Sequence, residues 1–251
     1  MRIKIILLLL IITSCSPRYK LLLQEKKEQP LDSQREILVL NKESNINLDG
    51  ASLIGEIKGP FEKFYTPPKA ELKGCGYTEI INDIKEQSKQ LGANIISIYD
   101  LKKPTSLDNC YKLKVKLYKS FDSNLISRIK EYNKSRMASK IDKDSEYAML
   151  YLYRPKAIAG MVVKFDIYID NDILITNLKN GNKLAYKIED FGHHTFTAIN
   201  QKGQKKEFSL DIKKGQEYYV RCGIDVSKPY GVAQFSMLDN KIGHEEFNKL
   251  K

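Results

Sequence analysis

Hydrophobic and polar positions alternate along the second half of the chain, which is the pattern of half-buried strands. In VKFDIYID, Val163, Phe165, Ile167 and Ile169 share one face, and the polar residues between them share the other. YAMLYLYRP is instead a nearly continuous apolar run, which predicts a buried strand ended by Pro155. Further strands are predicted at ILITNL, KLAYKI, HHTFTAI, EFSLDI, EYYVRCGI and VAQFSML. Turn residues separate them at roughly ten-residue spacing, so we predict an all-β sandwich domain over residues 146–251.

The first half of the chain mixes two periods. Short strands are predicted at EILVLNK (36–42), SLIGEIK (52–58), NIISIYDL (94–101) and CYKLKVKLYK (110–119). Between them Ile80, Ile81, Ile84 and Leu91 recur at helical spacing, with Thr78 able to cap the helix and Gly92 able to end it. The pattern predicts a small sheet with a helix on one face over residues 35–119, and an α+β fold class for the chain.

A polar segment separates these two regions. Residues 120–145 are rich in charged and polar side chains, with Leu125, Ile126 and Ile129 at helical spacing. We therefore predict a linker with a short helix here, and a domain boundary within it.

The chain begins with a basic start, an apolar run from Ile5 to Ile12, and small residues before Cys15. Eight apolar residues span about 12 Å as a helix, whereas a bilayer core needs roughly 20 residues. The segment 1–14 is therefore predicted to be a signal peptide. The tetrad Ile12, Thr13, Ser14, Cys15 resembles the lipobox of bacterial lipoproteins, which implies acylation of the Cys15 sulfur, with palmitate among the expected chains, and cleavage before it. An ordinary secretory signal with a chance cysteine is the alternative.

Residues 15–34 are predicted to form a lipidated tether. Ser16 to Gln34 is mostly polar and would reach about 65 Å when taut. Leu21, Leu22 and Leu23 are expected either to touch the lipid surface or to form a short helix docked on the domain. Ser16, which is not acidic, favours the outer membrane, facing the periplasm, by the sorting rule known for this family.

Composition restricts the partners. The hydrophobic fraction of 42%, with 15 Tyr and 9 Phe, is sufficient for packed cores. Loss of Arg2 and Lys4 with the signal lowers the formal charge from +11 to +9. Because the lysines are dispersed and the protein is expected to be exported, we predict an envelope protein or an anionic polymer as partner, and no nucleic acid.

Cys75 and Cys110 bracket the predicted helix and hairpin, and in an oxidising envelope they are expected to form a structural disulfide. A thiol switch or a metal pair is the alternative. The stretches GCGY (74–77), LGAN (91–94) and NCYKLKVKLY (109–118) make this region similar in layout to the disulfide-bonded domain of Rcs-pathway outer-membrane sensor lipoproteins. That resemblance transfers no active site.

The second half carries its own resemblance. FDIYIDND, LKNG, FGHHTF and KKGQEYYV are similar to the core of a domain of unknown function in bacterial lipoproteins, related to PEGA-type sandwiches. Phe191 stands where such modules often have Pro, and Lys214 where they often have Ala. The resemblance implies an accessory module without catalysis or an established ligand.

Few residues of the sequence are candidates for catalysis, metal binding or ligand binding. The chain has three histidines, and strand alternation makes His193 and His194 point apart, so neither a metal site nor any other cofactor is predicted. Cys222 alternates with core positions and is expected to be buried. The candidate ligand contacts are Tyr153, Arg154, His193 and His194.

These observations lead to one main hypothesis and one alternative. The main one is a membrane-anchored, non-enzymatic envelope lipoprotein that binds, senses or scaffolds. The alternative is an envelope hydrolase or metal-dependent enzyme using His193 and His194 with Glu189 or Asp190, which requires these side chains to converge in a cleft.

Overall fold

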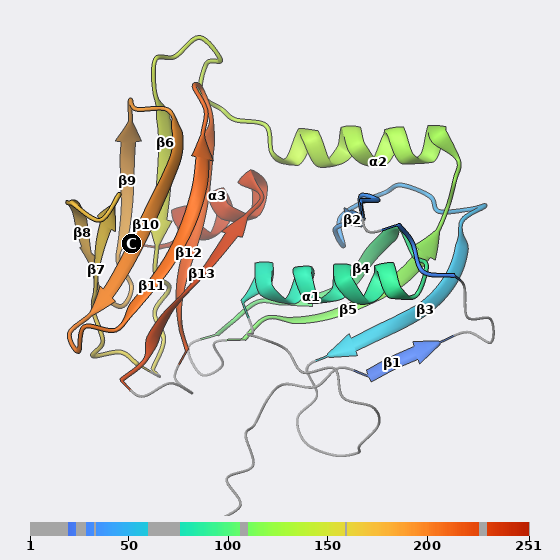
Figure 1. The fold of residues 1–251 in the computed structure, drawn as a ribbon, viewed down its shortest axis with the longest axis horizontal. Coiled ribbons are helices and arrows are strands. Elements are labelled where there is room, and N and C mark those ends of the chain that lie inside the picture. The colour runs from blue at the N-terminus through green and yellow to red at the C-terminus, as the bar shows by residue number, and fades with distance from the viewer. Residues whose placement is uncertain are drawn as a thin grey trace, which may run out of the picture.

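The structure is a computed structural model that describes residues 20–23, 29–32, 34–59, 76–105, 110–158, 160–225 and 230–250. In this part of the chain the fold is α+β and mostly β, with one five-stranded sheet, two four-stranded sheets and three helices. Figure 1 shows the five-stranded sheet beside the two smaller sheets, with the C-terminal helix between them.

The five-stranded sheet has the order β1-β3-β5-β4-β2. Its strands are β1 (Lys20–Leu23), β2 (Leu38–Leu40), β3 (Ser52–Gly59), β4 (Ile95–Lys102) and β5 (Lys112–Lys119). Neighbouring strands are antiparallel except for β2 and β4, which are parallel. The four strands predicted in this half are confirmed.

One helix lies on each face of this sheet. Adjacent residues of a strand point to opposite faces, so Ile95 and Ile96 belong to different cores. Ile96 packs with Ile80 and Ile84 of α1 (Tyr77–Gln90). Ile95 packs with Leu125 and Ile129 of α2 (Ser123–Arg136). The helix predicted within the 120–145 linker thus packs on the second face of the sheet.

Two details of the sequence prediction are corrected. Lys20–Leu23, predicted as part of a tether, forms β1 at the edge of the sheet, where its backbone pairs with β3. Thr78 does not cap α1: the helix begins after Gly76, whose N–H donates to Glu79 at 3.1 Å, while Thr78 donates to the Met237 carbonyl. Gly92 follows the end of α1 with φ +79°, as predicted.

The two four-stranded sheets have the orders β11-β10-β7-β8 and β13-β12-β6-β9. All eight strands predicted after residue 146 are confirmed: β6 (Ala148–Tyr153), β7 (Phe165–Ile169), β8 (Ile173–Leu178), β9 (Lys183–Ile188), β10 (Gly192–Asn200), β11 (Lys205–Ile212), β12 (Glu217–Asp225) and β13 (Val232–Leu238). Both sheets contribute to a single apolar core, which includes Leu150 and Val220 from one sheet and Ile167 and Phe196 from the other. The arrangement is sandwich-like.

The prediction that this half is all-β is wrong at its end. A helix, α3 (Asn240–Lys249), follows β13, and the Asp239 carboxylate caps it by accepting from the Ile242 N–H at 2.9 Å. Ile242 and Phe247 pack against Tyr153 and Tyr219, which point away from the sandwich core. The helix therefore covers the outer face of the β13-β12-β6-β9 sheet, on the side of the five-stranded sheet (Figure 1).

Candidate functional site

Some of the sequence-predicted site residues cannot be placed. Cys15 and Cys75 lie outside the described residues, so acylation and the Cys75–Cys110 disulfide stay predictions. Cys110 is described and is not a free thiol. Cys222 is a free cysteine, fully buried in the sandwich-like core, and burial raises its pKa to about 12. This thiol is packed as predicted, and a nucleophilic role would require a far lower pKa.

Arg154 and Tyr153 are held inside the protein. The Arg154 guanidinium donates to the carbonyls of Val163 at 2.6 Å and Gly160 at 2.8 Å, and burial lowers its pKa. The cavity beside it measures about 10 Å³, which is room for no more than about one water molecule. The Tyr153 hydroxyl donates to Glu246 at 3.1 Å. These two candidate ligand contacts therefore bond to other groups of the fold.

The two adjacent histidines diverge, as strand alternation predicts. His194 is buried, with Nδ1 2.7 Å from Asp170 and Nε2 3.1 Å from the Asp190 carbonyl. His193 is on the solvent side, 3.0 Å from Asp211. The convergent arrangement that the hydrolase alternative needs is not present at this pair.

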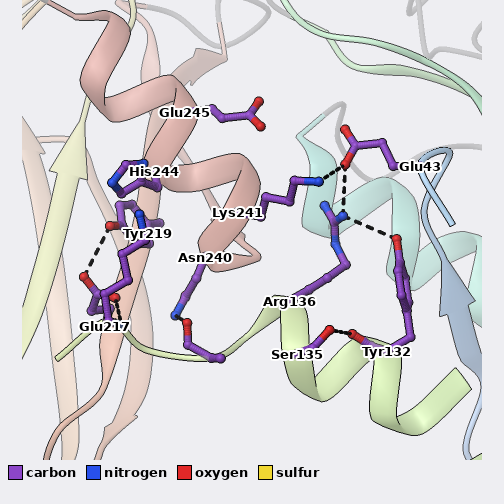
Figure 2. Close-up of a pocket in the computed structure, with 12 residues that line it drawn as sticks. Glu43, Tyr132, Ser135, Arg136, Glu217, Tyr219, Asn240, Lys241, His244 and Glu245 are labelled. Carbon is purple, nitrogen blue, oxygen red and sulfur yellow. Dashed lines mark hydrogen bonds and ion pairs between the residues drawn. The ribbon is translucent and has the colours of Figure 1, made fainter. Parts of the chain in front are cut away.

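A concave site lies where α2, α3 and β12 meet, a region that we call the junction cleft. Its volume is about 470 Å³, within the range of small-molecule sites. It is lined by Glu43, Tyr132, Ser135, Arg136, Ala138, Lys140, Glu217, Tyr219, Asn240, Lys241, His244 and Glu245. Figure 2 shows two groups of side chains facing each other across it.

The first wall is a network of ion pairs. Arg136, at the end of α2, donates to both carboxylate oxygens of Asp239 at 3.0 and 3.1 Å, and to Glu43 at 3.2 Å. Lys241 of α3 also donates to Glu43, at 2.7 Å. Hydrogen bonds from Lys241 and Arg136 hold the pKa of Glu43 below its usual range. The charges of this wall are thus paired within the protein.

The second wall is organised around Glu217, the first residue of β12. Its carboxylate accepts from the Lys140 backbone N–H at 2.6 Å, and the Tyr219 hydroxyl lies 3.4 Å away. Tyr219 stacks on Tyr151 with ring centroids 4.5 Å apart. Glu217 is only 6% exposed, and within the described ranges it forms no ion pair. A carboxylate buried without a counter-ion is costly in free energy, which sets this wall apart from the first.

The other side of α3 carries a partly buried carboxylate, Glu246, whose side chain is 12% exposed. Glu246 accepts from Tyr153 at 3.1 Å and from Tyr111 of the five-stranded sheet at 3.4 Å. Lys103 and Arg221 lie 3.4 and 3.5 Å from the same carboxylate. Burial raises the pKa of both tyrosines, and Glu246 raises it further. Glu246 therefore joins the two sheet systems directly.

Sequence reasoning missed this cleft because its residues come from four distant segments of the chain. Glu217 and Tyr219 lie in the KKGQEYYV stretch, but the resemblance assigns that stretch no ligand, and the helix that supplies Asn240, Lys241 and His244 was not predicted. A usable signal was the Asp239 and Asn240 pair directly after the last strand, which is a helix-start pattern.

Comparison of the chain with protein-family models, curated proteins and solved structures gave no match. None of the helices in the described ranges is long and apolar enough to cross a bilayer.

Proposed function

We propose that the chain is a lipid-anchored, non-catalytic protein of the cell envelope, held in the outer membrane and facing the periplasm. The observation that carries this proposal is the tetrad Ile12, Thr13, Ser14, Cys15 directly after a basic start and a short apolar run. In this proposal the Cys15 sulfur carries acyl chains, each buried CH₂ contributing about 0.8 kcal/mol to anchoring.

The two halves of the chain have different roles in this proposal. Residues 35–119 form a sheet-and-helix domain linked by a Cys75–Cys110 disulfide, and residues 146–251 form a PEGA-like sandwich that serves as an interaction module. The sandwich-like core shared by the two smaller sheets supports the second assignment. Glu246 of α3 accepts from Tyr111 of the first half and from Tyr153 of the second, which supports joint action of the two halves in binding, sensing or scaffolding.

The junction cleft is the proposed recognition site. It combines a volume suited to a small ligand or a peptide end with a wall of paired charges and a wall with a buried unpaired carboxylate. An envelope protein or an anionic polymer remains the proposed class of larger partner.

The experiment compares the native chain with Cys15→Ala in the cell of origin or a bacterial host. The native chain is expected in the membrane fraction, with a mass increased by acyl chains and with residues 1–14 removed. Cys15→Ala is expected to lose the acyl mass and leave the membrane fraction. Native chain found in the cell interior with residues 1–14 attached would overturn the proposal. Crosslinking in intact cells then identifies the partner.

A further inference from the structure

The strongest unexplained feature of the molecule is the Glu217 end of the junction cleft. Glu217 is 6% exposed, and its hydrogen-bond donors there are neutral: the Lys140 backbone N–H at 2.6 Å, the Ser139 hydroxyl at 3.5 Å and the Tyr219 hydroxyl at 3.4 Å. Lys140 contributes its backbone, and its ammonium forms no ion pair with Glu217. Neutral donors offset part of the cost of burying a carboxylate but leave its charge uncompensated.

An unsatisfied acceptor belongs to another residue that lines the same cleft. Asn240 is 5% exposed, and its side-chain N–H₂ donates to the carbonyls of Met137 at 3.0 Å and Ala138 at 3.2 Å. Its Oδ1 atom is buried and has no hydrogen-bond partner among the described residues. Buried acceptors in folded proteins nearly always have a donor, so a ligand N–H that reaches this atom would satisfy it.

The pKa values of the two tyrosines beside Glu217 also indicate a negative potential at this end of the cleft. Burial and then the charge of Glu217 raise the pKa of both Tyr151 and Tyr219. The cations on the opposite wall do not relieve it, because Arg136 and Lys241 are engaged by Asp239 and Glu43. Figure 2 shows these cations across the cleft from Glu217.

We propose that the Glu217 end of the junction cleft binds an organic ammonium group, which donates to the Glu217 carboxylate and to Asn240 Oδ1. The inference rests on the proposed recognition role of the cleft and specifies the chemistry that it recognises. A primary ammonium fits because it brings both the missing positive charge and more than one N–H donor. A carboxylate or phosphate is disfavoured at this end, since it would lie against a buried anion.

The three histidines of the chain make the test direct. His244 lines the cleft beside Tyr219, with ring centroids 6.3 Å apart, whereas His193 is exposed on β10 and His194 is buried against Asp170. The purified full chain, labelled with ¹³C at its histidine rings, is titrated with n-butylammonium to about 50 mM at constant ionic strength. Matched titrations use n-butyrate and n-butanol.

The expected result is a saturable shift of the His244 resonance with n-butylammonium, with His193 unmoved and no response to the other two probes. Glu217→Gln keeps an acceptor for the Lys140 N–H but removes the charge, and it should weaken binding about tenfold or more, since hydrogen bonds to charged groups are the stronger ones. Glu207→Gln, the same change at an exposed position of β11 that does not line the cleft, should leave affinity within about twofold.

The proposal would be overturned if the His244 resonance shifted in parallel with that of His193 throughout the n-butylammonium titration, or if n-butyrate produced an equal shift of the His244 resonance. An unchanged affinity in folded Glu217→Gln would overturn it as well. The His194 resonance reports whether that variant is folded, and if it is not, the comparison of probes on the native chain decides. None of these results depends on Cys15, so failure here is separate from failure of lipid anchoring.

Discussion

Asp170 shows how one side chain can fix a turn and a histidine together. It and Asn171 both have positive φ, of 51° and 67°, as expected at the centre of a tight two-residue hairpin turn. Its carboxylate accepts from the Thr195 N–H at 2.9 Å and lies 2.7 Å from His194 Nδ1. Burial alone would raise the pKa of Asp170, but the bonds from Thr195 and His194 outweigh it, and the pKa is lowered.

The Asp170 contacts predict a specific loss of stability in acid. A carboxylate whose folded pKa lies below its unfolded value contributes stability above about pH 4, and that stability is lost as pH falls through the folded pKa. Because the side chain is 49% exposed, the contribution should be under about 1 kcal/mol. Asp170→Asn should therefore lower the free energy of unfolding at pH 7 and match the native chain near pH 2.5.

Urea unfolding at both pH values measures this difference. Asp166→Asn serves as the matched control. Asp166 is in β7, the strand that leads into the turn, but it lies outside the turn itself. Equal effects of the two substitutions at pH 7 would contradict the role assigned to Asp170.

At this scale, the alternation rule worked where a residue's role follows from its parity in a strand. It placed His193 and His194 on opposite faces of their strand, and it buried Cys222 in the core. It could not identify Glu217 as the residue of interest, because an ion pair or its absence depends on residues distant in sequence. Sequence reasoning also gave Arg154 as a candidate ligand contact, although its guanidinium donates to two backbone carbonyls of a neighbouring loop.

Among the elements, α3 depends most on a single glycine. A Cβ atom on Gly243 would lie 2.1 Å from Cβ and 2.4 Å from Cγ of Tyr219, far inside contact distance. The absence of a side chain lets the helix backbone approach β12 closely enough for Ile242 and Phe247 to pack beside Tyr219. The glycine is thus required by close approach of the two elements.

Gly243→Ala should destabilise the protein, although Gly to Ala in a helix interior usually stabilises by up to about 1 kcal/mol. Overpacking against Tyr219 should cost about 1 to 3 kcal/mol, and the helix must shift away from the sheet. Lys249→Ala, an exposed change in the same helix, should stay within about 0.5 kcal/mol. Urea unfolding of both variants tests this, and a more stable Gly243→Ala would contradict the close packing.

The strands were predictable as elements because turn residues and parity both mark them in the sequence. The third helix was harder, because its apolar positions are few and its stability comes from packing on Tyr153 and Tyr219. The segment Lys20–Leu23 reads as a hydrophobic patch in a polar tether, and only its pairing partner, β3, makes it a strand.

At the scale of the whole molecule, the ion pair of Arg136 and Asp239 is a contact between distant parts of the chain. Their side chains are 6% and 12% exposed, and the contact joins the end of α2 to the start of α3. Burial opposes the charge of Arg136, but Asp239 and Glu43 outweigh it, and the pKa of the guanidinium is raised. The Arg136 guanidinium therefore keeps its charge beside Asp239.

Arg136→Ala should cost about 3 kcal/mol, because it leaves the partly buried Asp239 carboxylate without its counter-ion. Arg128→Ala, an exposed change on the same helix, should cost less than about 0.5 kcal/mol. Calorimetry should show one unfolding transition for the native chain and for Arg128→Ala, and a broadened or split transition for Arg136→Ala. A single sharp transition in all three would mean that the contact does not couple the two halves.

If Cys15 is acylated as proposed, the pairing of β1 with the sheet limits the distance between the five-stranded sheet and the membrane. Five Cα steps separate Cys15 from Lys20, so the sulfur-bearing residue lies within about 18 Å of the start of β1, far less than the reach of a 19-residue tether. Lys20 is paired in register with Lys58 of β3, which places this edge of the sheet close to the lipid surface. A photo-crosslinking residue at position 58 should therefore form lipid adducts in native membranes, whereas one at Lys206, exposed on β11, should form few. Insertion of ten Gly and Ser residues after Ser16 should remove the difference, and equal labelling at both positions without that insertion would show that β1 does not hold the sheet at the membrane.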